Sequence, residues 1–524
     1  MNGSASASAS APPRPRSGGL ERATRDAEPH WTRSEQCWVL ALAMAVAALA
    51  SWHLGRPTFW NDEAATWAIS GHGFGDLLHV LSTSGGDRGA ALYYVVAFGW
   101  MRLFGTTEIA LRSLSVLAAT LAILPFHAVA RRVVSRPAAW AAGLLFATSS
   151  LLVTYARDAR TYTFALLLVL VAVWTFLRAV ESTRTREWWI FVGVAFVAVA
   201  AHWFSALVVI ACFASFAFWR RPLGVLRRPV VVSAAALGIG ALAIAAQIAL
   251  GANTGLGWVA PLNAAELRAV ASGFTGSEVP IIQFAVAAVL VVGLVVAWSE
   301  RAARRVPPIV ITWFLVPIAA TIAVSTVKPV LVTRYLIVAL PGLTLLLGLG
   351  VAAVARLRTF AAVSGAALVA IVGLHGYSGL WSSSRGGEDW RSVVAAVATH
   401  ARPDEAIVVF PATAVSAFSY YARGQPRLAG RAGPAWPAVR WNSPFTRDIS
   451  NGSVLQSDVA VSPGVWLVVR APHGGVVARS VQESPVLDRL ERKLAREHPV
   501  VTLVSQWDQH DTVYVIHYTG STRQ

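Results

Sequence analysis

Two adjacent carboxylates follow the first long apolar stretch of the chain. Asp62 and Glu63 lie within residues 58–64, whose sequence is TFWNDEA. A carboxylate that is partly desolvated at a membrane surface can act as a general base toward a hydroxyl group. The same acids also fit the first turn of a helix capped by Asn61, because they complement the positive end of its dipole. We take both as candidate catalytic residues, with this structural alternative left open.

A third candidate catalytic acid, Asp158, stands between two arginines in residues 155–162 (YARDARTY). Arg157 or Arg160 can bind a phosphate, while Asp158 can orient a sugar hydroxyl or join the first acidic pair. The alternative is that Asp158 only neutralises its neighbours. Tyr162 ends this motif and is counted with the candidate substrate-binding residues.

Four more candidate substrate-binding residues lie further along the chain. Lys328 and Arg334 separate two apolar stretches, and Tyr335 follows directly. Fixed cations at a membrane boundary suit a lipid-borne phosphate, although such side chains also anchor helices by reaching toward headgroups. His202 precedes two aromatic residues, and a single histidine in that setting is more typical of an interface than of catalysis.

Motifs for soluble cofactors are missing from the sequence. It contains no glycine-rich nucleotide loop, Walker motif, HExxH or GxSxG element, so a soluble nucleotide-dependent site is not supported. The two cysteines, Cys37 and Cys212, have no metal-ligand spacing. The sequence indicates no cofactor beyond a divalent ion, which two separated acids could bind although no ligand set is evident.

The composition requires that most of the chain lie in lipid. Of 524 residues, 55% are hydrophobic and 14% charged, with a mean hydropathy of +0.55, which is too apolar for an ordinary soluble fold. The net charge of +17 would suggest nucleic acid as a partner of a soluble protein. Here the arginines form short clusters between apolar runs, which is typical of topology anchors.

Apolar stretches predict about eleven spans, because about 20 residues cross the hydrocarbon. The run at residues 187–219 is too long for one span and is expected to form two short helices that turn near His202. The other stretches lie near residues 36–54, 110–130, 137–154, 161–178, 230–250, 281–298, 308–327, 331–354 and 359–379.

The positive-inside rule decides the orientation. If residues 90–104 form an interfacial helix with its aromatic residues at the headgroup level, the arginine clusters all fall on the side of the N-terminus. These clusters lie at residues 131–136, 178–186, 220–228, 301–305 and 356–358. The N-terminus is then cytoplasmic and the C-terminus external. Lys328 and Arg334 lie outside, against the general bias, which favours a binding role for both.

Three regions follow from these patterns. Residues 1–34 are expected to be a disordered cytoplasmic tail, and residues 35–382 an all-α polytopic membrane domain whose outer loop, residues 55–109, carries interfacial helices. Residues 383–524 are expected to form a small extracytoplasmic α/β domain. Its strands are predicted at residues 406–410, 465–469, 500–507 and 512–518, and its helices at residues 391–401 and 486–498.

The motifs together resemble those of the bacterial members of the dolichyl-phosphate-mannose protein mannosyltransferase superfamily, glycosyltransferase family 39, which has the GT-C fold. The resemblance covers about residues 36–380. It rests on FWNDE at residues 59–63, ALRSLS at 110–115, YARDARTY at 155–162, HWF at 202–204, RYL at 334–336 and LPG at 340–342. The chain departs from the family in having Asp158 where the family has Glu, and GAALY at residues 89–93 where it often has a Pro-Pro pair.

The resemblance implies an enzyme that takes a sugar from a polyprenyl monophosphate carrier at the outer face of a bacterial plasma membrane, with inversion. Asp62 corresponds to the acidic residue near the acceptor and is the first choice of base, with Glu63 and Asp158 secondary. Lys328, Arg334 and Arg160 would stabilise the leaving phosphate. Mannose follows from the family name alone, and the acceptor is a glycan, a glycolipid or a protein.

Two other functional classes compete with this interpretation. A transporter or flippase of lipid-linked saccharide would also need an external phosphate site, but it should show paired repeats and polar residues at mid-membrane, which the sequence lacks. A scaffold that binds cell-wall glycan would tolerate substitution of the outer acids. An enzyme would not.

Overall fold

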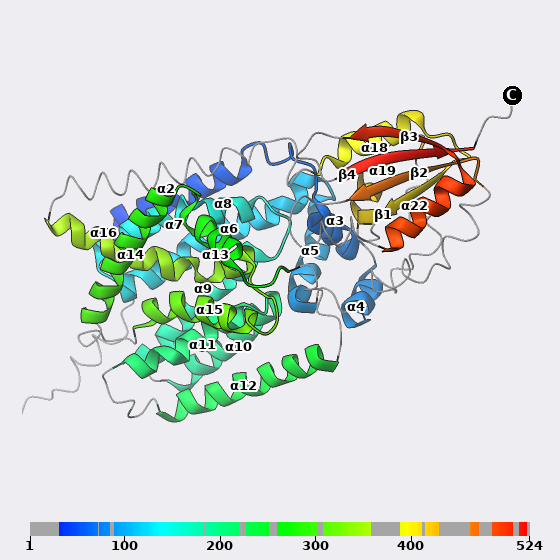
Figure 1. Ribbon diagram of the computed structural model, residues 1–524. Coiled ribbons are helices and arrows are strands. Elements are labelled where there is room, and N and C mark those ends of the chain that lie inside the picture. Colours follow the sequence, from blue (N-terminus) through cyan, green and yellow to red (C-terminus); the bar gives the residue numbers. More distant parts are fainter. Residues whose placement is uncertain are drawn as a thin grey trace, which may run out of the picture.

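The computed structural model describes residues 31–71, 73–83, 88–182, 184–219, 224, 227–250, 259–300, 308–357, 388–410, 414–428, 462–470, 485–506 and 513–520. Long helices run beside one another in a bundle, a four-stranded sheet lies at one end, and short helices lie between the two (Figure 1). Nearly all of the predicted tail and the predicted span at residues 359–379 lie outside the described residues.

The helices of the bundle and its outer loop occupy the first two thirds of the chain. They are α2 (Arg33–Ser51), α3 (Asn61–Ser70), α4 (Phe74–Thr83), η1 (Arg88–Ala90), α5 (Ala91–Phe104), α6 (Glu108–Val133), α7 (Arg136–Ala147), α8 (Ser150–Ala156), α9 (Tyr162–Ser182), α10 (Thr185–Ala201), α11 (Ser205–Ala214), η2 (Ser215–Phe218), α12 (Arg227–Leu250), α13 (Ala264–Thr275), α14 (Pro280–Glu300), α15 (Ile309–Ser325), η4 (Thr333–Ala339) and α16 (Leu340–Leu357). Among the described residues, five helices are long and apolar enough to cross a membrane, or six if α7 and α8, bent by 47°, form one span. The chain is therefore a helical protein with several apolar spans.

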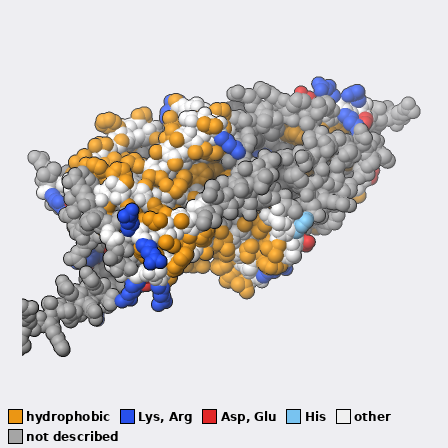
Figure 2. Space-filling model, turned by 90° about the horizontal axis from the view of Figure 1, so that it is seen from below, with side chains coloured by type: hydrophobic (Ala, Val, Ile, Leu, Met, Phe, Trp, Pro, Cys, Tyr) orange, Lys and Arg blue, Asp and Glu red, His pale blue; other side chains and the backbone are white. Residues whose placement is uncertain are grey.

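One end of the bundle collects positive charge. Thr32 and Glu35 form a reciprocal capping box that starts α2, and Glu35 also pairs with Arg131 at 2.7 Å and Arg136 at 3.4 Å. These pairs bring the start of α2 beside the end of α6 and the start of α7. Figure 2 shows hydrophobic side chains over most of the described helical surface, with basic side chains gathered toward the end away from the sheet. The side of the membrane that this end faces stays a prediction.

Glycines allow α16 to lie unusually close to its neighbours. A Cβ atom on Gly293 of α14 would lie 2.0 Å from the carbonyl oxygen of Leu346, and one on Gly348 would lie 2.4 Å from that of Ala138 in α7. Small residues bring helix backbones together in this way because lipid supplies no hydrophobic drive for helix association. Helix α16 is thereby held at the centre of the bundle.

Helix α5 is confirmed as a short apolar helix, but two of its aromatic side chains do not lie where they are expected. Tyr93 and Tyr94 are buried in the protein and do not face lipid headgroups. The cause is the phenol group, which needs a partner when it is buried: the Tyr94 hydroxyl accepts a hydrogen bond from Arg160 at 2.8 Å. Helix α5 therefore packs against the outer turns of the bundle.

The C-terminal part is a mixed α/β unit. Strands β1 (Ala406–Phe410), β2 (Gly464–Arg470), β3 (Val500–Gln506) and β4 (Val513–Thr519) form a sheet in the order β1-β2-β4-β3, with β1 and β2 parallel and the other pairs antiparallel. Its helices are α18 (Trp390–His400), α19 (Val415–Ala422) and α22 (Pro485–Glu497). The four strands and helices α18 and α22 agree with the elements predicted from the sequence, whereas α19 was not predicted.

The C-terminal unit and the helical part share one hydrophobic core. Phe59, Leu111 and Ala159 of the helical part belong to the same buried cluster as Trp390 and Phe418 of the C-terminal unit. The segment that follows α2 therefore packs against both the helical part and the C-terminal unit.

We predict that Gly293→Ala destabilises the protein by about 1–3 kcal/mol, because the added methyl group overpacks the contact with α16. Thermal unfolding in detergent micelles measures this effect. Gly193→Ala is the matched control, since no atom lies within 4 Å of its Cβ position. Equal unfolding temperatures for the two variants would contradict the close packing of α14 on α16.

A buried carboxylate joins two strands of the sheet to the end of α18. Glu405 accepts hydrogen bonds from the backbone N–H of Arg402 at 2.8 Å and from Nε1 of Trp466 at 2.8 Å, and lies 3.0 Å from Nε2 of His517. Burial by itself raises the pKa of Glu405, but these hydrogen bonds outweigh it and hold the pKa below its ordinary value of 4.5. Glu405 is therefore ionised in the folded protein at neutral pH.

A lowered pKa makes this carboxylate a source of stability at neutral pH. Its contribution is complete above the ordinary pKa and is lost as the pH falls through the folded value. We predict that acidification from pH 7 to about pH 4 lowers the thermal unfolding temperature of the wild type more than that of Glu405→Gln. The same temperature decrease in both proteins would show that Glu405 does not contribute.

Candidate active site

A buried arginine organises the end of the bundle that lies beside the C-terminal unit (Figure 1). Arg112 of α6 donates from Nε and Nη2 to the two carboxylate oxygens of Glu63 at 2.7 and 2.6 Å. Its remaining N–H groups reach the carbonyl oxygens of Leu54 and Pro57 at 2.8 Å and of Thr58 at 3.0 Å. Both side chains are at most 1% exposed. The guanidinium thus fixes the chain after α2 against α6.

Glu63 also fixes the turn at residues 157–161. Its Oε1 atom accepts a further hydrogen bond from the backbone N–H of Ala159 at 2.9 Å. Because the carboxylate is fully buried and bonded at both oxygens, it has no access to a substrate. These contacts argue against the predicted role of Glu63 as a secondary catalytic acid and give it a structural place between α6 and the 157–161 turn.

Arg157 is likewise held inside the protein. Its guanidinium donates to the carbonyl oxygens of Ala50 (3.0 Å), Trp52 and His53 (3.4 Å). These carbonyls lie at the C-terminal end of α2, where a helix leaves its last acceptors without partners. The side chain is 4% exposed. Arg157 therefore caps α2, and this contact argues against the predicted phosphate contact.

The remaining acids lie on facing segments. Asp158 is buried and accepts a hydrogen bond from Nε1 of Trp60 at 2.8 Å. Arg160 donates from Nη1 to the backbone carbonyl of Asp62 at 3.3 Å and to the Tyr94 hydroxyl at 2.8 Å. The 157–161 turn is thus bonded directly to the first turn of α3, and the structure places Asp62 and Asp158 at one end of the bundle.

Asp62 faces a cation. Its Oδ2 atom lies 3.6 Å from Nη2 of Arg334, and the two side chains are 27% and 18% exposed. The guanidinium also lies over the rings of Trp60 at 5.4 Å and Tyr335 at 5.6 Å, which hold it by cation–π attraction. The ion pair is longer than a normal hydrogen bond. An incoming anion can therefore compete with Asp62 for Arg334.

Aromatic rings form one wall beside this ion pair. Tyr162 lies 6.0 Å from the ring of His202 and 6.3 Å from that of Tyr335, while Tyr335 lies 5.2 Å from His202 and 5.1 Å from Phe204. Nδ1 of His202 accepts from the backbone N–H of Phe204 at 3.2 Å. This histidine is therefore packed as part of the wall.

The predicted site residues divide into three groups. The structure brings together Asp62, Asp158, Arg160, Tyr162, His202, Arg334 and Tyr335. Glu63 and Arg157 are bonded elsewhere. Lys328 lies exposed in the turn before η4, and among the described residues its side chain has no hydrogen-bond or ion-pair partner. Sequence reasoning missed Arg112 as an organising residue, although ALRSLS at residues 110–115 supplied a signal.

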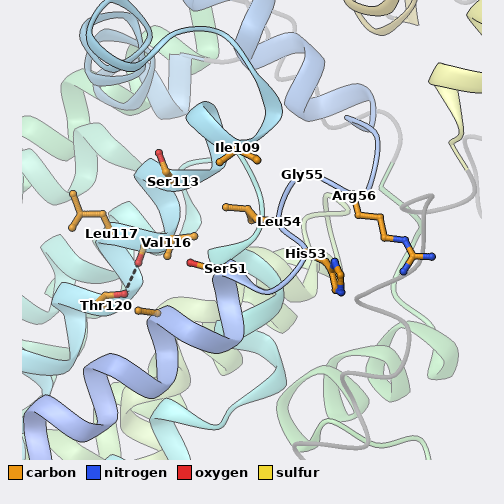
Figure 3. Close-up of a pocket in the computed structure, with 11 residues that line it drawn as sticks. Ser51, His53, Leu54, Gly55, Arg56, Ile109, Ser113, Val116, Leu117 and Thr120 are labelled. Carbon is orange, nitrogen blue, oxygen red and sulfur yellow. Dashed lines mark hydrogen bonds between the residues drawn. The ribbon is translucent and has the colours of Figure 1, made fainter.

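A separate groove of about 650 Å³ lies between α2 and α6. Figure 3 shows His53 and Arg56 at one end of this groove and Leu117 and Thr120 at the other. None of the predicted site residues lines it. It is therefore distinct from the cluster around Asp62.

The described residues do not form a protein-built metal site. No group of three or more His, Cys, Asp or Glu side chains in this part of the chain could hold a metal ion. Asp62 and Asp158 alone would leave most ligand positions of a divalent ion to substrate and water.

Comparison with known proteins supports the resemblance seen in the motifs. The profile of the family described as dolichyl-phosphate-mannose-protein mannosyltransferase matches residues 87–249, a segment that includes Arg112 and the 157–161 turn. The resemblance to this family is therefore confirmed. No curated protein matches the sequence significantly.

The fold is similar to that of ArnT from Cupriavidus metallidurans. The crystal structure of ArnT in the apo state has a TM-score of 0.56 and 14% sequence identity, covering 92% of this chain and 98% of that chain. The structure of the same ArnT bound to undecaprenyl phosphate has a TM-score of 0.53 and 15% identity, covering 93% and 99%. The chain has the GT-C fold along most of its length.

We predict that Arg112→Met destabilises the protein by about 3–5 kcal/mol, because it leaves the Glu63 charge buried without its partner. Thermal unfolding in micelles provides the measurement. Arg268→Met is the control, since Arg268 is exposed on α13. Replacing both charges, in Arg112→Met with Glu63→Leu, should recover part of the loss. A double variant less stable than the single variant would argue against the buried pair.

Proposed function

We propose that the protein is a glycosyltransferase that moves a sugar from a polyprenyl monophosphate to an acceptor hydroxyl at the outer face of a bacterial plasma membrane. The observation that carries this proposal is the partly exposed pair of Asp62 and Arg334, 3.6 Å apart, beside an aromatic wall. The pair and the aromatic wall together provide a base, an anion-binding cation and a surface for a sugar ring. The GT-C fold favours sugar transfer over translocation.

Arg334 is the first residue to meet the donor phosphate. A phosphate oxygen makes a stronger, charge-assisted bond to a guanidinium than the 3.6 Å contact with Asp62. Binding of the donor therefore exchanges one anion for the other and releases Asp62. Arg334 then stabilises the charge that develops on the leaving oxygen, with Arg160 and Lys328 as further cations near the same membrane boundary.

Asp62 acts as the general base in this proposal. It accepts the proton of the acceptor hydroxyl while the acceptor oxygen attacks the anomeric carbon and the bond to the phosphate oxygen breaks. Attack opposite the leaving phosphate inverts the anomeric configuration. Asp158, buried against Trp60, supports the site, and the rings of Tyr162, His202 and Tyr335 border the sugar.

The finer assignments rest on the sequence. Mannose is proposed as the sugar from the family resemblance, with a glycan, glycolipid or protein as acceptor. We further propose about eleven spans, each of about 20 residues, a cytoplasmic N-terminus and an extracytoplasmic C-terminal domain. The bound undecaprenyl phosphate named for the similar ArnT structure supports a polyprenyl carrier.

We predict that Asp62→Asn lowers sugar transfer by about 10²–10⁴-fold, because the amide cannot accept the hydroxyl proton. Purified protein is mixed with radiolabelled polyprenyl-phosphate mannose and other lipid sugars, and sugar transfer is followed. Asp76→Asn is the matched control, because Asp76 is exposed on α4 of the same outer loop. Equal rates for wild type and Asp62→Asn would exclude Asp62 as the base.

Arg334→Gln should instead weaken use of the donor, with transfer reduced about 10²-fold or more, because the leaving phosphate loses its cation. The affinity for polyprenyl phosphate, measured by its protection against thermal unfolding, should fall in parallel. Unchanged protection would place the phosphate away from Arg334.

A further inference from the structure

Glu388, two residues before the start of α18, accepts hydrogen bonds from both the helical part and the C-terminal unit. Its side chain is 4% exposed. Oε1 accepts from Nε and Nη2 of Arg470 in β2, at 2.9 and 2.6 Å. Oε2 accepts from Nε1 of Trp390 and from the backbone N–H of Asn61, both at 2.9 Å. The last of these bonds reaches the first residue of α3.

Helix α3 lacks a cap of its own. The residue before it, Trp60, makes no side-chain capping bond, and the first N–H groups of a helix have no partners within the helix. A carboxylate at this end satisfies a donor and complements the helix dipole. Glu388 supplies this cap from 327 residues away, and the next residue of α3 is Asp62.

Two neighbouring contacts hold the same segment to the C-terminal unit. The Thr58 hydroxyl donates to the backbone carbonyl of Glu388 at 2.5 Å, and the backbone N–H of Phe59 donates to the Tyr421 hydroxyl at 2.7 Å. Residues 58–61 are thus bonded to the C-terminal unit at three points. The position of Asp62 therefore depends on that unit.

We infer that Glu388 is a positioning residue for catalysis, which sets the place and direction of Asp62 by capping α3. The C-terminal unit is then part of the catalytic apparatus and not only a candidate acceptor-binding module. This inference rests on the proposed function for its catalytic consequence. The structural part of the inference, which is that Glu388 caps α3, can be tested without an assay of sugar transfer.

A second buried carboxylate provides a matched control. Glu405 is also buried and also accepts from an indole N–H, that of Trp466, while a basic partner, His517, lies 3.0 Å away. Its partners Arg402, Trp466 and His517 lie within the C-terminal unit. Glu405→Gln therefore perturbs that unit as Glu388→Gln does, but it leaves the cap of α3 intact.

The first measurement is hydrogen–deuterium exchange on the full-length protein in micelles. In Glu388→Gln the amides at residues 61–70 should exchange about tenfold faster than in the wild type, because the charged cap is lost. In Glu405→Gln they should exchange as in the wild type. Equal exchange of α3 in wild type and Glu388→Gln, or equal acceleration in both variants, would overturn the inference.

The second measurement is steady-state sugar transfer. A small displacement of a base can lower the rate about 10²-fold, so Glu388→Gln should reduce kcat by about ten- to a hundredfold with little change in KM for the donor. Glu405→Gln should keep the wild-type kcat. A wild-type kcat in Glu388→Gln, or the same loss in both variants, would contradict the positioning role. A wild type that transfers no lipid-linked sugar would refute the proposed function, while the exchange result would still decide the capping role.

Asn61→Pro removes the donor that Glu388 binds. Proline is favoured at the first position of a helix, so α3 should still form. The losses in kcat from Asn61→Pro and Glu388→Gln should then be strongly non-additive in the double variant, because both act on the hydrogen bond between the Asn61 N–H and Glu388. Additive losses would mean that Glu388 does not act through Asn61.

Discussion

The end of the bundle beside the C-terminal unit depends on the buried pair of Arg112 and Glu63. Removing two charges from water is expensive, and it is tolerated only where every hydrogen-bonding group finds a partner. Here the guanidinium and the carboxylate meet that requirement by binding the chain after α2 and the 157–161 turn. The hydrogen bonds that this one ion pair makes therefore fix the segments that carry Asp62 and Asp158.

Two ion pairs of the same chemical type have opposite roles because their burial differs. Arg112 and Glu63 are in contact at 2.6 Å and inaccessible, so the pair is permanent. Arg334 and Asp62 are 3.6 Å apart and partly exposed, so an anion can separate them. The first pair provides a rigid frame, and the second provides the groups that exchange partners during the proposed transfer.

The sequence predicted the helical bundle and the four strands, because apolar runs and strand periodicity are local signals, and most of the residues that it offered as site candidates lie together at one end of the bundle. It could not separate the roles of Asp62 and Glu63. Adjacent residues on a helix point about 100° apart, so only one of them faces the site. Two distant partners decide which acid faces the site. Arg112 binds Glu63 from 49 residues away, and Glu388 binds the Asn61 N–H from 327 residues away. The spacing of residues within one motif carries no information about such partners.

In the proposed mechanism, the phosphate of the donor takes Arg334 from Asp62. A cryo-electron microscopy structure of the protein with polyprenyl phosphate bound tests this exchange most directly. We expect a phosphate oxygen within hydrogen-bond distance of Arg334 and an Asp62 carboxylate that has separated from the guanidinium and faces the site. A phosphate bound elsewhere, with the pair of Asp62 and Arg334 still closed, would contradict it.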